Sequence, residues 1–292
     1  MNDKARLEAA AEPRAGDVVG PYTVEFMLGE GGMGRVYQAA AADGSKVALK
    51  LVKADLATDT IFRRRFDREA RTAARVQHPN VVPVLSTGEH DGIPYMAQEF
   101  IAGGSLQDKI EREGKLSLED TVSILAGVAP GLDALHECGL IHRDVKPGNI
   151  LLREDGFPYI TDFGLAKDRE GTVLTKAGQA LGSMDYMAPE QIRGEEVSGQ
   201  ADVYALGCVT IECLVGAPPF ADRKGMRILW AHLQEDAPDP SSSREDVSAD
   251  LGWAILRALE KEPDKRPPTA TAYATMIQRA AGVNPTTTGG LS

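Results

Sequence analysis

Between Tyr22 and Ile101 the apolar residues fall in short runs that are rich in β-branched and aromatic side chains. Asp43-Gly44 and Asp91-Gly92 stand between such runs, which is the pattern of hairpin turns. The chain is therefore predicted to begin with a β-rich region. Its expected strands are Tyr22–Leu28, Gly34–Ala39, Lys46–Val52, Val81–Leu85 and Pro94–Phe100.

One segment of this region has the period of a helix instead. From Thr60 to Val76, apolar residues recur at spacings of three and four, which places them on one helical face. The same segment carries six arginines. The residues expected on the apolar face are Phe62, Phe66, Ala70, Ala73 and Ala74.

After Gly103-Gly104 the apolar pattern becomes helical. The expected helices are Leu118–Cys138, Ala201–Val215, Arg223–Gln234, Ala249–Leu259 and Thr269–Ala281. This change of period predicts an α+β chain with a small β-rich lobe at 21–101 and a larger helical lobe at 102–281. Residues 1–20 are expected to be a weakly ordered extension, and the Thr/Gly-rich residues 282–292 a flexible tail.

Composition narrows the class of protein. The hydrophobic fraction of 42% and charged fraction of 26% are globular averages, which excludes a wholly disordered or fibrous chain. No apolar run reaches about 18 residues, and no secretory signal begins the chain, so no membrane contact is expected within it. The three cysteines cannot form a disulfide scaffold. Cys208 and Cys213 are predicted to be small buried residues, which suits a reducing compartment.

The net charge is −11, from 43 acidic and 32 basic residues. Residues 1–101 hold 14 acids and 13 bases, whereas residues 102–292 hold 29 acids and 19 bases. The acidity therefore lies in the helical lobe. This distribution argues against a protein that binds nucleic acid through a broad basic face.

A glycine-rich segment gives the first chemical signal. Residues 29–36 match the pattern G-x-G-x-x-G-x-V, in which glycines let the backbone approach a polyphosphate. A dinucleotide-binding loop has this pattern, and Asp55 could be its ribose-binding acid. A hairpin over ATP phosphates has it too, and is followed by a lysine on the next strand, where Lys50 stands. An ordinary glycine-rich turn is the third interpretation. This segment alone does not distinguish the three interpretations.

The helical lobe carries motifs that are far more specific. A carboxylate, a lysine and a carboxamide stand close together at Asp144, Lys146 and Asn149. Asp162-Phe163-Gly164 and then Ala188-Pro189-Glu190 follow. These motifs are unlikely to occur by chance in this order downstream of the glycine-rich segment.

This order of motifs resembles that of protein kinases. Over about residues 22–280 the chain is similar to the bacterial eukaryotic-like (Hanks-type) Ser/Thr protein kinases. The resemblance implies a bilobal protein-kinase fold, with one helix in the β-rich lobe. It also implies ATP-dependent phosphate transfer to protein serine and threonine hydroxyls (EC 2.7.11.1), and it replaces the dinucleotide interpretation.

The resemblance also assigns catalytic roles. Asp144 would orient the substrate hydroxyl and accept its proton, and Lys146 would stabilise the γ-phosphate. Asn149 and Asp162 would hold Mg²⁺, with Mn²⁺ as the alternative, because hard cations prefer oxygen ligands. Lys50 would hold the α- and β-phosphates. Catalysis is therefore expected to rest on positioning and charge neutralisation.

Further residues are expected around ATP. Val36 and Ala48 would lie above the adenine and Leu151 below it, and Glu69 would pair with Lys50. The full set that the resemblance implies for ATP binding is Leu28, Gly29, Gly31, Gly34, Val36, Ala48, Lys50, Glu69, Gln98, Glu99, Ile101 and Leu151.

Other matching residues are expected to be structural. His142 would pack beneath Phe163 rather than bind a metal. Glu190 and Arg266 resemble the buried ion pair of the helical lobe, and Asp202 resembles the acid that anchors the catalytic loop's backbone.

Kinase activity is expected to be regulated by a phosphorylated residue that binds to Arg143, because a guanidinium matches phosphate oxygens. The candidates are Thr172, Thr175 and Ser183, of which Thr175 aligns best with the family's autophosphorylated threonine. Two positions depart from the family pattern. Ser183 stands where most Ser/Thr kinases carry threonine, and Gln98 stands where many carry an apolar residue.

Two alternative functions use the same fold. A pseudokinase scaffold is disfavoured because Lys50, Asp144, Asn149 and Asp162 are all intact. A small-molecule phosphotransferase is disfavoured by residues 188–190, which shape a platform for protein substrates. The chain contains no P-loop pattern, which excludes a P-loop NTPase.

The expected partners are protein substrates and a second copy of the chain, as a homodimer for trans-autophosphorylation. No nucleic acid is expected. The expected location is the cytoplasm, either for a free kinase or for the cytoplasmic domain of a longer membrane-anchored receptor kinase.

Overall fold

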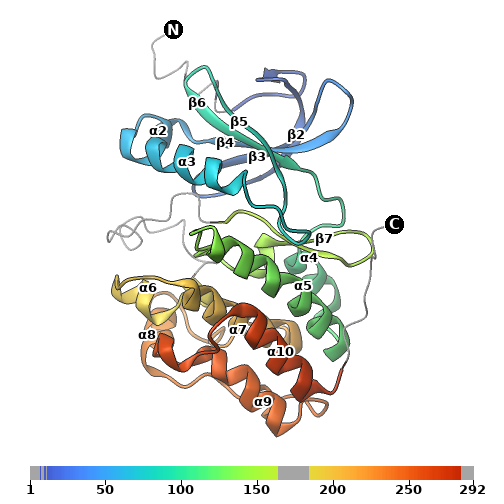
Figure 1. Cartoon of the computed structure of the whole chain (residues 1–292), viewed down its shortest axis with the longest axis vertical. Coiled ribbons are helices and arrows are strands. Elements are labelled where there is room, and N and C mark those ends of the chain that lie inside the picture. Colours follow the sequence, from blue (N-terminus) through green and yellow to red (C-terminus); the bar gives the residue numbers. More distant parts are fainter. Residues whose placement is uncertain (1–6, 8–9, 11, 164–183, 284–292) are drawn as a thin grey trace. The chain divides into compact units, whose positions relative to one another are not determined.

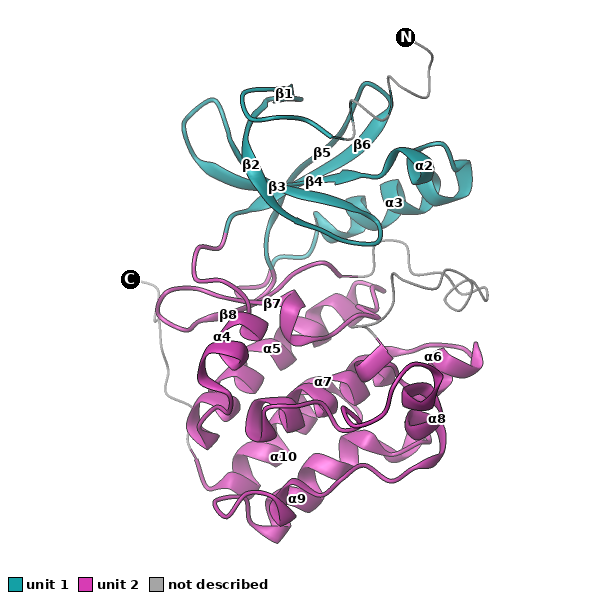
Figure 2. Cartoon of the chain, turned by 180° about the vertical axis from the view of Figure 1, so that it is seen from behind, with its two compact units in different colours: residues 1–77, 82–100 teal, residues 78–81, 101–292 magenta. Residues whose placement is uncertain are grey.

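The computed structural model describes residues 7, 10, 12–163 and 184–283. The chain divides into two units (Figure 2). Unit 1 contains residues 1–77 and 82–100, and unit 2 contains residues 78–81 and 101–292. The predicted α+β class is confirmed: unit 1 is built on a β-sheet, and unit 2 is mainly helical (Figure 1).

Unit 1 holds a six-stranded antiparallel sheet of order β1-β2-β3-β4-β6-β5. The turn at Asp43-Gly44 joins β3 to β4, and Gly44 adopts a φ of 83° that favours glycine. The strands are β1 (Val18–Val19), β2 (Tyr22–Glu30), β3 (Gly34–Ala40), β4 (Lys46–Val52), β5 (Val84–His90) and β6 (Ile93–Glu99).

The strand expected at Val81–Leu85 is displaced. The structure begins β5 at Val84, and Val81 instead makes an isolated parallel bridge with Ile160 in unit 2. Pro83 supplies the reason, because proline has no N–H with which to continue a strand ladder.

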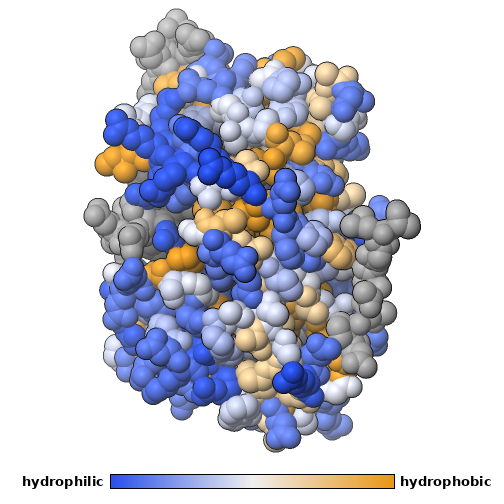
Figure 3. Space-filling model, in the orientation of Figure 1, coloured by the Kyte–Doolittle hydropathy of each residue, from blue (hydrophilic) through white to orange (hydrophobic). Residues whose placement is uncertain are grey.

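Helix α3 (Thr60–Ala73) follows the short helix α2 (Ala54–Ala57) and contacts β5. Asp59 caps α3, since its side chain accepts the N–H groups of Ile61 and Phe62. Four of the five residues predicted on the apolar face are buried: Phe62, Phe66, Ala70 and Ala73. The prediction is wrong for Ala74, which is exposed because it lies at the C-cap, past the last helical residue. The opposite face is strongly hydrophilic, as the deep blue band over α3 in Figure 3 shows.

Unit 2 is organised around α5 and α7. Helix α7 is buried along nearly its whole length, including Cys208 and Cys213, as predicted for both cysteines. Helix α10 packs on α5, whose Asp133 accepts the N–H groups of Ala270 and Thr271 at 2.9 Å each. The longer helices are α5 (Leu118–Glu137), α7 (Gly199–Val215), α8 (Met226–Gln234), α9 (Ala249–Leu256) and α10 (Ala270–Ala281).

Several short elements of unit 2 were not predicted. Helix α4 (Leu106–Glu113) begins with a capping box between Ser105 and Asp108, a signal that the sequence carries. The others are the hairpin of β7 (Ile150–Leu152) and β8 (Pro158–Ile160), and helix α6 (Pro189–Arg193). Elements this short give too few residues for a periodic pattern.

Candidate active site

Unit 1 gathers several expected ATP-binding residues on one face of its sheet. In the antiparallel register Val36 lies opposite Lys50, and Ala48 lies opposite Gln98. Directly opposed residues point to the same face, as do residues two apart on one strand. Val36, Ala48, Lys50 and Gln98 therefore share a face, as the resemblance requires.

The three glycines of the loop have two different structural reasons. A Cβ atom at Gly34 would lie 1.9 Å from the carbonyl oxygen of Leu51, so only glycine permits this approach of β3 to β4. A Cβ at Gly29 would meet nothing within 4 Å, and one at Gly31 would meet only the Gly34 oxygen at 3.9 Å. Packing within the chain therefore explains Gly34, whereas Gly29 and Gly31 leave open backbone that suits a phosphate ligand.

The remaining unit 1 candidates lie on β2, β6 and α3. Leu28 and Glu99 are exposed, whereas the side chain of Glu69 is only 12% exposed and lies 3.8 Å from Arg68. The expected pairing of Lys50 with Glu69 stays a prediction. Gln98 is 4% exposed, and its Nε2 has no hydrogen-bond partner among the residues that the structure describes. Position 98 therefore carries a buried hydrogen-bond donor, which an apolar side chain at this position would lack.

Unit 2 brings three expected catalytic side chains into direct contact. Asp144 Oδ2 lies 3.1 Å from Lys146 Nζ. Asn149 Nδ2 donates to the Asp144 carbonyl at 2.8 Å and to its carboxylate at 3.2 Å. The carboxylate is therefore held in one orientation by a cation and an amide. Such an arrangement positions a carboxylate to accept a proton from a bound hydroxyl.

Asp162 is brought beside this group by the β7–β8 hairpin. Asn149 precedes β7 and Asp162 follows β8, and the Thr161 N–H donates to the Asn149 carbonyl at 3.0 Å. Asp162 and Arg143 have φ values of 58° and 61°, a strained backbone for residues other than glycine. Such strain is often found at functional sites.

These oxygen donors suit a hard divalent cation. The carboxylate of Asp162 is one donor, and the Asn149 side-chain oxygen is another, because the Asn149 nitrogen is already committed to Asp144. Within the described residues no group of three or more His, Cys, Asp or Glu side chains could hold a metal. Mg²⁺ commonly uses only one or two protein ligands and completes its shell with phosphate and water oxygens.

Asp202 of α7 holds the backbone before Asp144. Its two carboxylate oxygens accept the N–H groups of His142 and Arg143, each at 2.8 Å, and Oδ2 also lies 2.7 Å from His136 Nε2. The carboxylate is 1% exposed. The predicted anchoring of the catalytic loop is thus seen directly.

His142 has the structural role expected for it. Its ring meets Phe163 edge-on at 6.3 Å between centroids. Nδ1 accepts the Asp144 N–H at 3.3 Å, so Nε2 carries the proton and donates to the Thr161 carbonyl at 2.9 Å. Burial lowers the pKa of His142, which keeps the ring neutral and both hydrogen bonds intact.

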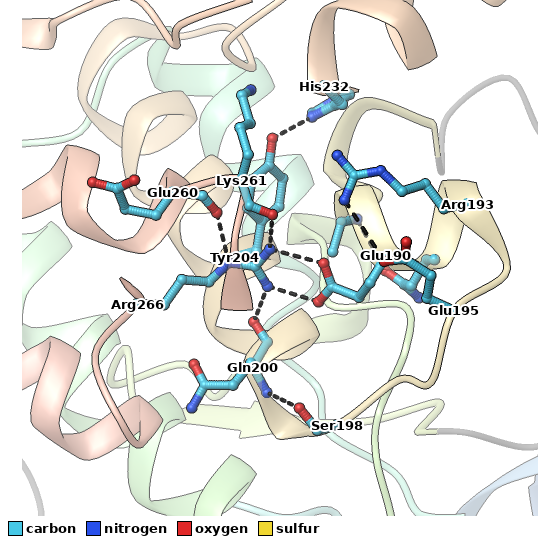
Figure 4. A network of polar contacts seen from close by, with 12 residues as sticks. Glu190, Arg193, Glu195, Ser198, Gln200, Tyr204, His232, Glu260, Lys261 and Arg266 are labelled. Carbon is cyan, nitrogen blue, oxygen red and sulfur yellow. Dashed lines mark hydrogen bonds and ion pairs between the residues drawn. The ribbon is translucent and has the colours of Figure 1, made fainter. Parts of the chain in front are cut away.

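Glu190 and Arg266 form the buried ion pair that the resemblance implies (Figure 4). The contact is bidentate at 2.7 and 2.8 Å. The remaining guanidinium N–H groups donate to the carbonyls of Glu260, Gln200 and Lys261, so all five donors are used.

Two residues that sequence reasoning missed extend this network. Tyr204 lies under the Arg266 guanidinium at 4.9 Å and shares a 2.8 Å hydrogen bond with His232 Nδ1. Burial and the charge of Lys261 lower the pKa of His232 to about 3, so the ring is neutral. Gln191 was also missed; its Nε2 donates to the Arg143 carbonyl at 3.2 Å. No local pattern marks any of the three.

The unit 2 residues expected near adenine are Ile101, which is 8% exposed, and Leu151, which is half-buried on β7. Arg143 has its main chain fixed on both sides, by Asp202 and by Gln191. The phosphorylation candidates Thr172, Thr175 and Ser183 lie outside the described residues.

The contact of His136 with Asp202 can be tested by measuring how stability depends on pH. Burial by itself would lower the pKa of His136, but the hydrogen bond to Asp202 and the charges of Asp202 and Asp133 outweigh it and raise the pKa. In the unfolded chain the pKa of a histidine is about 6.5. Its stabilisation is therefore complete below about pH 6.5 and is lost as the pH rises through the folded-state pKa.

We expect His136→Gln to cost most stability near about pH 6, and the cost to shrink as the pH rises. Urea unfolding of both proteins from about pH 5.5 to 9 measures it. The buried histidine His142 has a lowered pKa and an opposite effect, but it is present in both proteins and cancels in the difference. A cost independent of pH would contradict the prediction.

The chain matches the family model described as "Protein kinase domain" over residues 22–276. Serine/threonine-protein kinase PknH of Mycobacterium bovis is 40% identical over 261 residues, which cover 89% of this chain and 44% of the relative. PknE of Mycobacterium tuberculosis is also 40% identical, over 89% of this chain and 46% of the relative. The chain thus spans less than half the length of these two relatives.

A solved structure supports the same assignment. The PknI kinase domain of M. tuberculosis is 33% identical and superposes with a TM-score of 0.76, over 93% of this chain and 100% of that domain. The predicted protein-kinase fold is confirmed. The chain belongs to the protein kinase domain family.

Proposed function

We propose that the residues described above carry out phosphate transfer from ATP to protein serine and threonine hydroxyls in bacterial signalling. The observation that carries the proposal is the contact of Asp144 with Lys146 and Asn149, with Asp162 next to them along the β7–β8 hairpin.

Each group has a defined task in this proposal. The Asp144 carboxylate orients the substrate hydroxyl and takes its proton, while Lys146 lies close enough to offset charge on the transferred phosphate. Lys50 holds the α- and β-phosphates, and the open backbone at Gly29 and Gly31 covers them. Val36, Ala48 and Leu151 contact the base, and Glu69 pairs with Lys50.

Asn149 and Asp162 would hold Mg²⁺, with Mn²⁺ as the alternative. A cation held there would neutralise phosphate charge, which the carboxylates of Asp144 and Asp162 cannot do by themselves.

The proposal is tested by incubating the protein with labelled ATP and a serine-containing peptide, with Mg²⁺, with Mn²⁺ and with a chelator. We expect transfer that requires a divalent cation. ATP binding without transfer to any peptide or to the protein itself would favour the pseudokinase alternative. Transfer of phosphate to small molecules only would favour the small-molecule phosphotransferase alternative.

Thr175 is proposed as the activating autophosphorylation site, received by the Arg143 guanidinium. We expect Thr175→Ala to lower kcat for peptide phosphorylation by at least about tenfold, because the activating phosphate cannot form. Mass spectrometry of the protein after incubation with ATP checks the site. Thr172→Ala is the matched control and should keep most activity. Full activity of Thr175→Ala would contradict the assignment.

We further propose that this phosphorylation occurs between two copies, and that the domain works in the cytoplasm, where ATP is supplied. A catalytically inactive copy mixed with an active one should become phosphorylated if the reaction is intermolecular. Among the described residues, no helix combines the length and apolar character needed to cross a bilayer.

A further inference from the structure

Four exposed arginines follow one face of α3 and of the turn after it. Arg64, Arg68, Arg71 and Arg75 are spaced four, three and four residues apart, which places successive side chains above one another. They are called the arginine row below. The buried residues of α3 lie on the opposite face, so the row points away from the sheet of unit 1. In Figure 3 much of the surface over α3 is deep blue, the colour of hydrophilic residues.

The row carries almost no compensating charge. Arg64, Arg71 and Arg75 make no ion pair within the described part of the chain, and Arg68 makes only a 3.8 Å contact with Glu69 while its side chain stays 76% exposed. By contrast, Arg63 on the flank of the same helix is paired with Glu89. One exposed acid on α3, Asp67, lies beside the row. Four positive charges thus face solvent in a protein whose net charge is −11.

The basic residues of α3 are all arginines, although lysine is about as favourable in a helix. Arginine differs from lysine in its planar fork of N–H donors, which matches two oxygens of a phosphate at once. Its guanidinium also loses less hydration on binding. The choice of residue therefore favours a ligand with phosphate groups over general electrostatic attraction.

The spacing of the row sets the geometry of that ligand. Arg64 with Arg68, and Arg71 with Arg75, form two pairs, each one helical turn apart. At about 1.5 Å rise per residue the centres of the pairs are about 10 Å apart. Three residues of an extended peptide span about the same distance. Two phosphates with close to two negative charges each would balance the four arginines.

We propose that the arginine row binds an extended protein segment that carries two phosphorylated serine or threonine residues three positions apart. Each phosphate lies between the two guanidinium groups of one pair. Ile61 is 68% exposed and precedes Arg64 by one turn, so it offers an apolar contact at one end of the segment. This surface differs from the ATP and catalytic residues, and its binding does not require that those assignments hold.

A phosphorylated segment suits the row better than a membrane or a nucleic acid does. Those polyanions are wide and are usually met by a broad basic field. The row is one side chain wide and about 16 Å long, and the exposed acid Asp67 lies beside it. The overall net charge of −11 would oppose an extended polyanion.

The test is fluorescence anisotropy without ATP or Mg²⁺, with a labelled ten-residue peptide that has leucine near one end and two phosphoserines three positions apart. Its comparison peptides carry the phosphoserines at adjacent positions, glutamates in their place, or unmodified serines. We expect the first peptide to bind most tightly. The double variants Arg64→Gln/Arg68→Gln and Arg71→Gln/Arg75→Gln should each weaken binding by about tenfold.

The matched control is Arg227→Gln/Arg279→Gln, which removes the same charge from two exposed arginines elsewhere. It should leave peptide binding unchanged. Thermal unfolding of all variants checks that the fold is kept, which the exposure of the row predicts. Equal peptide affinity of wild type and both row variants would overturn the proposal. Row-dependent binding to phosphatidylserine vesicles, with none to the peptides, would overturn it in favour of a membrane surface.

Discussion

Replacing Asp144 with asparagine is expected to reduce kcat for phosphate transfer about 10³-fold. Asparagine keeps the shape of the side chain but cannot accept the proton of the substrate hydroxyl. It also removes the negative charge that lies 3.1 Å from Lys146. The contacts around residue 144 include a hydrogen bond from Asn149 to the backbone carbonyl, which the substitution leaves in place.

Phosphate incorporation from labelled ATP measures kcat, and titration calorimetry measures ATP binding, which should change by no more than about threefold. Asp236→Asn removes an equal charge from an exposed position of unit 2 and should leave kcat unchanged. Activity of Asp144→Asn within about tenfold of wild type would remove Asp144 from its proposed role as proton acceptor.

Replacing Arg266 with alanine is expected to lower the free energy of unfolding by about 3–5 kcal/mol. The side chains of Glu190 and Arg266 are 2% and 0% exposed, so the substitution leaves a buried carboxylate without its partner. The carbonyls of Glu260, Gln200 and Lys261 lose their donor as well. The loss includes the packing of the guanidinium on Tyr204.

Urea unfolding followed by circular dichroism gives the difference. The matched control is Arg257→Ala, because Arg257 also makes a 3.0 Å ion pair, with Glu260, but is 35% exposed. That loss should stay below about 1 kcal/mol. The double variant Glu190→Leu/Arg266→Met should recover part of the stability, since no buried charge is then left unpaired. Equal losses for Arg266→Ala and Arg257→Ala would contradict the buried-pair argument.

Local pattern was sufficient for the larger elements of the fold. The helical period of residues 60–76 predicted α3 and its buried face, although the structure ends the helix at Ala73. The apolar stretch around Cys208 and Cys213 predicted a buried helix, which is α7. Both predictions depend on spacing within one segment, which the sequence displays directly.

Short or interrupted elements were predicted poorly. The strand expected at Val81–Leu85 starts at Val84 in the structure, because Pro83 cannot donate to a ladder. Helix α4 and the β7–β8 hairpin were missed because each is too short for its period to stand out. The capping pair Ser105 and Asp108 was the available signal for α4.

The order of motifs determined the family and indicated the proposed catalytic residues, because each motif is a run of neighbours in the chain. Only the tertiary structure decided how those residues are held. Asp202 accepts a hydrogen bond from a backbone N–H about 60 positions away, and Tyr204 is hydrogen-bonded to His232 on another helix. Gly34 is required by a carbonyl on the next strand. Such contacts depend on which segments fold against each other, and no local spacing encodes that.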